Sequence, residues 1–230
     1  MLAILLLDPV PAVEASLTAA GAHLQQAQAL LLEDQELDPT HPERARLLQA
    51  QGRLALRQGD FLGSRRAYAR ATGLLRRHDP ASREVLDNIL MEVEPAYGLA
   101  DHSSIVQHAR SEGQALVDAL RTDPAVDTGL IAWYIAESFV KQTSRSEAAV
   151  YFQTALDAYT ALGAADMVAE LHWQLAQSLA ATPARADAAR VHATASFAHH
   201  QAAGDRPKAA TISRWLKRHA SAQRPNQSTP

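Results

Sequence analysis

The chain has 230 residues, of which 47% are hydrophobic, 5% aromatic and 20% charged, with a formal net charge of −3. About a fifth of the residues are alanine, which has the highest helix propensity and is far above its ordinary usage. This composition predicts an all-α protein and disfavours β-sandwiches and barrels, which need β-branched and aromatic residues. The absence of cysteine excludes disulfides, thiolate catalysis and cysteine-ligated zinc. The small net charge argues against general affinity for nucleic acid or anionic membranes.

The N-terminal region, residues 1–42, is expected to be helical. Met1–Leu7 is apolar, and a Pro-x-Pro bend and a long helix from about Ala12 to Leu32 follow it. The apolar start lacks the basic flank and length of a signal peptide and is much shorter than a membrane span. We therefore expect a truncated repeat or an ordinary N-terminal helix, in a cytoplasmic chain that does not contact membranes.

A helix–turn–helix pattern begins near residue 43. Gly52 lies in the middle of one predicted helix, and a Gly59-Asp60 turn follows. The next helix carries two small residues and one aromatic residue at helical spacing, which are Ser64, Tyr68 and Ala71. Small residues allow helix backbones to approach closely, and Gly-Asp suits a tight turn. The pattern predicts two antiparallel helices with an aromatic side chain between them.

The same spacing recurs twice further along the chain. The corresponding residues are Ala136, Ala148, Phe152 and Ala155 in one copy, and Ala176, Ala188, His192 and Ala195 in the other. Before these copies there is room for one weaker unit, residues 82–120, with its turn at residues 98–101. Pro95 is expected to end or kink the first helix of that unit.

These copies resemble the tetratricopeptide repeat (TPR), a helix–turn–helix unit of about 34 residues. The resemblance covers residues 43–203 as about four units and implies an α-solenoid of antiparallel helix pairs, a TPR-like superhelix. The interval of 40 residues between Ala136 and Ala176 resembles the long-period variants of bacterial transcriptional regulators. Residues 204–220 are expected to form a C-terminal capping helix, and residues 221–230 a disordered tail.

In TPR proteins, the first helix of each unit lines a concave groove that binds a protein or peptide. The resemblance places groove residues on three units, and these are Arg46, Gln49, Arg53 and Arg57, then Trp133, Glu137 and Lys141, then Trp173 and Gln177. Further groove positions are Leu56, Leu130, Val140, Glu170 and Ala180. The arginines suit an acidic peptide but also fit a solvated face. The two tryptophans either contact a partner or pack between repeats, and the sequence leaves both open.

Motifs for catalysis or phosphate binding are absent, including G-x-x-x-x-G-K-[ST], G-x-S-x-G and H-E-x-x-H. Of the ten histidines, His192 and His199 are two helical turns apart, too far to chelate one ion unaided, and His192 takes the aromatic position of its copy. We therefore interpret His192 as a packing residue and expect no enzyme activity, metal or cofactor. The basic stretch from Arg206 to Arg224 is interpreted as a solvated face, so direct nucleic-acid binding is not expected.

The leading hypothesis is a non-catalytic, protein- or peptide-binding TPR-like domain that acts as a bacterial regulatory or sensory module. The arginine-rich, lysine-poor composition suggests a GC-rich bacterium, and the resemblance to regulators allows a homodimer. The first alternative is a stand-alone scaffold subunit of a protein complex. The second is a metal-binding or enzymatic helical protein that uses the histidines. The sequence leaves open the ligand, the oligomeric state and any upstream DNA-binding domain.

Overall fold

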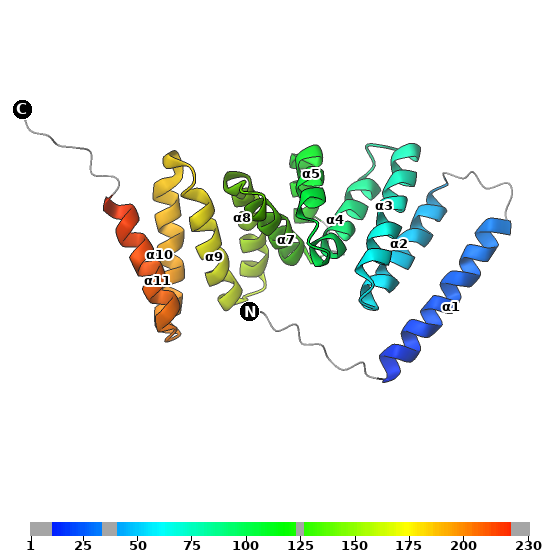
Figure 1. Cartoon of the computed structure of the whole chain (residues 1–230), viewed down its shortest axis with the longest axis horizontal. Coiled ribbons are helices and arrows are strands. Elements are labelled where there is room, and N and C mark those ends of the chain that lie inside the picture. The colour runs from blue at the N-terminus through cyan, green and yellow to red at the C-terminus, as the bar shows by residue number, and fades with distance from the viewer. Residues whose placement is uncertain (1–10, 34–40, 123–126, 222–230) are drawn as a thin grey trace, which may run out of the picture. The chain divides into compact units, whose positions relative to one another are not determined.

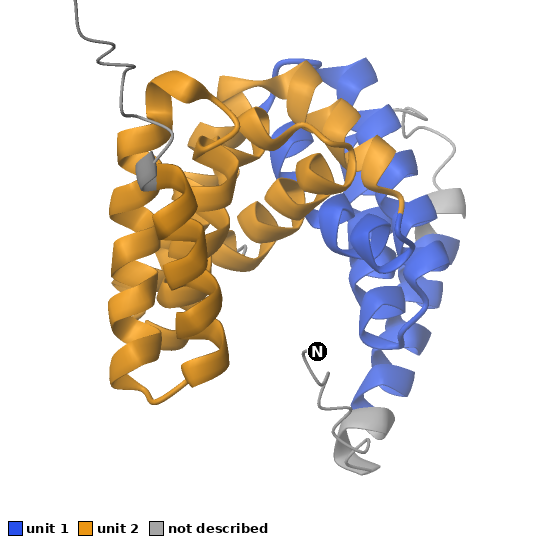
Figure 2. Cartoon of the chain, turned by 60° about the vertical axis from the view of Figure 1, so that its left-hand side comes forward, with its two compact units in different colours: residues 1–100 blue, residues 101–230 orange. Residues whose placement is uncertain are grey.

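The computed structural model describes residues 11–33, 41–122 and 127–221. Within these ranges every regular element is a helix and no strand occurs, which confirms the all-α prediction. The chain divides into two compact units, residues 1–100 and 101–230 (Figure 1 and Figure 2). The division falls inside the weaker unit that the sequence pattern suggested for residues 82–120.

Unit 1 is a row of helices in which each packs against the next. Its described helices are α1 (Pro11–Glu33), α2 (Pro42–Arg57), α3 (Phe61–His78) and α4 (Arg83–Gly98). α1 confirms the long helix expected from about Ala12 to Leu32, whereas Met1–Leu7 lies outside the described residues. α4 continues beyond Pro95 to Gly98, so of the two effects expected of Pro95, an end or a kink, the end of the helix is excluded.

Unit 2 contains the rest of the described helices. They are α5 (His102–Glu112), α6 (Gln114–Thr122), α7 (Thr128–Lys141), α8 (Arg145–Ala161), α9 (Ala165–Leu179), the short 3-10 helix η1 (Pro183–Arg185), α10 (Ala186–Ala202) and α11 (Arg206–Ser221). From α7 to α11 each α-helix packs against the preceding one, and α5 also packs against α7. α11 lies where the sequence predicts the terminal helix, and the tail expected at 221–230 lies almost wholly outside the described residues.

Four of the helix connections end the preceding helix in the same way. Each has one residue with positive φ, and these are Gly59 (77°), Thr143 (60°), Gly163 (68°) and Gly204 (75°). The next residue donates its N–H to a carbonyl in the last turn of the preceding helix, as in Asp60 to Ala55 (2.9 Å) and Ser144 to Phe139 (2.8 Å). This is the Schellman ending, and it reverses the chain within three residues.

Paired helices approach closely at the positions that the repeat pattern predicts. In α3 and α8 the expected small and aromatic residues are all buried, and these are Ser64, Tyr68 and Ala71, then Ala148, Phe152 and Ala155. Their partners Gly52 in α2 and Ala136 in α7 are buried too. A Cβ atom on Gly52 would lie only 2.9 Å from the Tyr68 ring. A residue without a side chain is therefore required where this ring crosses α2.

In the last copy, the predicted register of the second helix is wrong by one residue. Ala188 and Ala195 are exposed, whereas the fully buried residues of α10 are Ala189, Ala193 and Ser196. The connection from α9 to α10 passes through η1, and the spacing from Ala176 to the buried Ala189 is 13 positions, one more than the 12 from Ala136 to Ala148. His192 is therefore not the aromatic packing residue of this copy, because Ala193 occupies that position.

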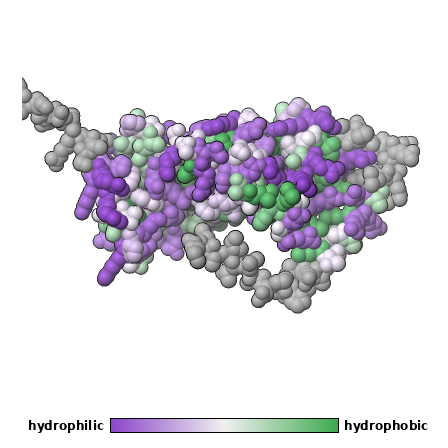
Figure 3. Space-filling model, viewed as in Figure 1, coloured by the Kyte–Doolittle hydropathy of each residue, from purple (hydrophilic) through white to green (hydrophobic). Residues whose placement is uncertain are grey.

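Apolar side chains are mainly turned inward. Figure 3 shows mostly hydrophilic residues over the visible face of α9, α10 and α11. The most exposed large apolar residues are Leu162 (72%) in a turn and Val191 (68%) on α10. Among the described residues, no helix combines the length and the apolar character that a membrane span requires.

The contact between Gly52 and Tyr68 predicts opposite effects for two glycine-to-alanine changes. Gly52→Ala forces the Tyr68 ring to move and should lower the free energy of unfolding by about 1–3 kcal/mol. Gly73→Ala, on an exposed part of α3 where a Cβ atom meets nothing within 4 Å, should raise it by about 0.5–1 kcal/mol through helix propensity. Urea denaturation of both variants tests this, and equal effects would contradict the close approach.

The shared turn geometry predicts a stabilising change at Thr143. This β-branched residue has positive φ, a conformation that glycine adopts without steric cost. Thr143→Gly should therefore raise the free energy of unfolding by about 0.5–1 kcal/mol. In the equivalent turn, Gly163→Ala should lower it by about 1 kcal/mol. Thermal and urea unfolding measure both, and a loss of stability in Thr143→Gly would refute the assigned geometry.

Candidate functional site

The groove residues predicted in unit 1 lie along α2. Arg46, Arg53 and Arg57 are exposed and Gln49 is half-buried. Arg46 forms ion pairs with Glu43 on its own helix and with Glu84 on α4, the latter at 3.3 Å. Hydrogen bonds to Glu84 and Glu43 raise the pKa of the Arg46 guanidinium. Part of its binding capacity for carboxylates is thus already used within unit 1.

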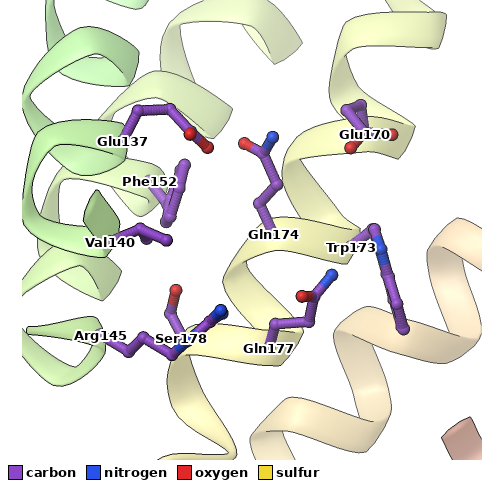
Figure 4. A pocket seen from close by; sticks show the side chains of 9 residues that line it. All are labelled: Glu137, Val140, Arg145, Phe152, Glu170, Trp173, Gln174, Gln177 and Ser178. Atoms are coloured by element: carbon purple, nitrogen blue, oxygen red, sulfur yellow. The ribbon is translucent and has the colours of Figure 1, made fainter. Parts of the chain in front are cut away.

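A polar pocket of about 160 Å³ lies among α7, α8 and α9 in unit 2 (Figure 4). It brings together three predicted site residues, Glu137 from α7 and Trp173 and Gln177 from α9. The further groove positions Val140 and Glu170 also line it. The structure therefore brings predicted groove residues of α7 and α9 together in one pocket.

Four other side chains complete the lining and were not among the predicted groove residues. They are Arg145, Phe152, Gln174 and Ser178. Gln174 lies one helical turn from the predicted Glu170, so helical spacing could have indicated it. Ser178 follows Gln174 by another turn. Arg145 and Phe152 come from α8, and no signal in the sequence relates that helix to the groove.

The pocket has chemically different ends. In Figure 4, Glu137 and Glu170 lie towards one end, and Arg145 and Ser178 lie towards the other. Ser178 is fully buried, and its hydroxyl has no hydrogen-bond partner among the residues that the structure describes. A buried hydroxyl without a partner is unfavourable by about 1–3 kcal/mol. A bound group that hydrogen-bonds to Ser178 would therefore recover part of that free energy.

Burial is the main cause of the raised pKa of Glu137. The positive charge of Lys141 opposes this rise, the negative charge of Glu170 adds to it, and Arg145 opposes it. Lys141 itself is exposed and does not belong to the pocket lining. Glu170 is held by Lys208 of α11, whose ammonium lies 2.6 Å from its carboxylate. Glu137 has no ion pair within 4 Å among the described residues, so its carboxylate is available to a ligand.

The two predicted tryptophans have different environments. Trp173 is only 8% exposed, and its ring meets that of Trp215 on α11 edge to face, with 5.6 Å between centroids. Trp133 is half-buried, and its indole N–H donates to the Gln174 amide oxygen at 3.0 Å. Trp173 therefore packs against the terminal helix while forming part of the pocket wall, and Trp133 orients a pocket residue.

A serine–histidine contact elsewhere in unit 2 lacks the arrangement of a nucleophile and its base. The Ser138 hydroxyl donates its single hydrogen to the Tyr134 carbonyl at 2.8 Å. Nδ1 of His102, 3.1 Å from the same oxygen, must then act as the donor. Ser138 is also fully buried. This pair joins α5 to α7 and cannot activate Ser138 in this geometry.

The histidines lie in pairs on the last helices. His172 contacts His192, and His199 and His200 contact the carboxylates of Asp166 and Asp205. Among the described residues, no three histidine, aspartate or glutamate side chains converge as a metal site requires. The described basic residues of the C-terminal stretch, including Arg214, lie on α11.

Comparisons with known proteins leave the function to be inferred from these residues. No protein family model matches the chain, and no curated protein sequence matches it. Among solved structures, it is similar to the crystal structure of BtubC (BKLC) from P. vanneervenii, with a TM-score of 0.47 and 16% sequence identity. That match covers 94% of this chain and 96% of BtubC.

The different environments of the tryptophans predict different losses of stability. Trp173→Ala removes a buried ring that packs on Trp215, so it should lower the free energy of unfolding by about 3–5 kcal/mol. Trp133→Phe keeps most of the apolar contact and removes one hydrogen bond, so it should cost about 1 kcal/mol. Urea unfolding of the full chain provides the measurement. Similar losses in both variants would contradict the packing role of Trp173.

Proposed function

We propose that this chain is a non-catalytic binding domain of TPR-like helix pairs, stacked as an α-solenoid, that holds a protein or peptide segment in a groove of first helices. Two features support the TPR-like assignment. The helix connections repeat the same left-handed turn, and buried small residues recur where the helices of a pair meet. In solenoids, each unit contacts only its neighbours. From α7 to α11, each α-helix likewise packs against the next one in the chain.

The observation that carries the proposed function is the pocket of unit 2. Glu137 of α7 and Trp173 and Gln177 of α9 line one concavity, and all three are positions that the TPR resemblance assigns to ligand contact. The hydrogen-bonding groups of this pocket include the Gln174 and Gln177 amides, the Ser178 hydroxyl and the carboxylates of Glu137 and Glu170. Such a mixture of donors and acceptors suits the main chain and polar side chains of an extended peptide.

The biological setting follows from the resemblance to long-period TPR variants. A regulatory or sensory module in the bacterial cytoplasm, whose bound peptide or protein partner changes its activity, agrees with the cysteine-free, weakly charged composition. The arginines of α2 would add contacts to acidic residues of a partner, chiefly through the exposed Arg53 and Arg57, because Arg46 already contacts Glu43 and Glu84.

Pocket substitutions that keep the core intact test this proposal. Partners captured by the full chain from its native host are identified by mass spectrometry, and their binding segments are synthesised as peptides. The double variant Glu137→Gln/Gln177→Ala should bind such a peptide at least about tenfold more weakly, a loss of about 1.4 kcal/mol. Titration calorimetry measures the affinities.

Gln107→Ala provides the matched control, because Gln107 is an exposed glutamine on α5 outside the pocket lining. It should leave the affinity unchanged. Far-UV circular dichroism establishes that both proteins are folded. If the double variant binds every captured peptide as tightly as the wild type, the pocket is not the binding site and the proposal fails.

A further inference from the structure

Two histidines face each other where α9 packs against α10. Nδ1 of His172 lies 2.8 Å from Nδ1 of His192, and their ring centroids are 5.0 Å apart. Both side chains are half-buried. The contact thus joins adjacent helices of unit 2 through a hydrogen bond between two titratable rings.

This hydrogen bond restricts the protonation states of the pair. A neutral imidazole carries one N–H, so one ring must donate through Nδ1 while the other accepts there. A first proton leaves one Nδ1 as an acceptor, because the neutral ring can still receive the bond from its charged partner. After a second proton both Nδ1 atoms carry hydrogen, and two positive charges face each other without an acceptor.

Charged groups on the surrounding helices do not neutralise this pair. Asp166 is engaged by His199 at 3.0 Å, Glu170 by Lys208, and Asp205 by His200 at 3.2 Å. The packed elements carry further charged or titratable groups. They are Arg145, Glu147, Tyr151, Asp157 and Tyr159 on α8, Arg185 on η1, Asp187 and Arg190 on α10, and Arg206, Arg214, Lys217, Arg218 and His219 on α11. None of these groups is a cause of the pKa shifts of His172 and His192.

Burial lowers the pKa of both histidines, and the charge of His172 lowers the pKa of His192 further. An imidazole with a lowered pKa in the folded state binds fewer protons there than in the unfolded state, whose value is near 6.5. The stability from this contact is therefore complete above about pH 6.5 and decreases as the pH falls through and below that value.

We propose that His172 and His192 form an acid-sensitive latch, in which protonation of both rings breaks their contact and releases α10 and α11 from α9. The effect would extend to the pocket wall, because Trp173 follows His172 on α9 and contacts Trp215 on α11. Lys208 of α11 also holds the pocket residue Glu170. The latch acts between about pH 5 and 6.5, where the charge of histidine changes.

Amide hydrogen exchange of the full chain tests the latch. After correction for intrinsic exchange rates, the opening equilibrium constant of α10 amides should rise at least about tenfold from pH 7.5 to about pH 5 in the wild type. In His172→Gln and His192→Gln it should rise less than about threefold, because glutamine can hydrogen-bond the remaining imidazole without gaining a proton. His78→Gln, at an exposed position on α3, should behave as the wild type.

Two results would overturn the proposal. One is a wild-type opening constant of α10 that does not change over this pH range. The other is a rise in both glutamine variants that equals the rise in the wild type. Because either variant could be poorly folded, NMR titration of the wild-type imidazoles provides an independent measurement. If both His172 and His192 titrate at or above about 6.5, the ordinary value, the latch does not exist. None of these measurements requires a ligand, so they test the latch independently of peptide binding.

Discussion

Close approach between the two helices of each pair is the constraint on which the rest of this structure depends. Alanine, serine or glycine stands at the points where backbones cross, as at Gly52 under the Tyr68 ring and at the fully buried Ala136 and Ala148. Small side chains lose little conformational entropy on burial, but they also bury little apolar area. Stability must then come from many short contacts along each helix, which explains the abundance of alanine and the scarcity of aromatic residues.

The tight turns also keep the two helices of a pair close together. A Schellman ending with one residue of positive φ reverses the chain in three residues and leaves the next helix antiparallel and adjacent. Where the connection is longer, as at η1 between α9 and α10, the second helix shifts its buried face by one residue. That shift places the fully buried Ala193 at the position expected for His192, and the half-buried His192 instead meets His172 of α9.

α9 connects the features of unit 2 that concern function. Glu170, Trp173 and Gln174 line the pocket with α7 and α8, while His172 contacts α10. Trp173 and Glu170 also contact Trp215 and Lys208 of α11. Since a helix presents different faces at successive residues, the face of α9 that lines the pocket and the faces that pack on α10 and α11 belong to one helix. The proposed latch between His172 and His192 would therefore act on side chains of the pocket through these contacts.

The sequence alone determined the helical class, the long N-terminal helix, the paired helices and most buried small residues, because helix propensity and period are local properties. The resemblance to the TPR also indicated Glu137, Trp173 and Gln177, which line one pocket. Only the tertiary structure decided that Trp173 packs on Trp215, that Arg46 is already paired with Glu84, that α8 contributes Arg145 to the pocket and that His192 meets His172. These contacts join residues far apart in the chain, and their geometry depends on the exact length of each connection, where a single extra residue turns a helix by about 100°.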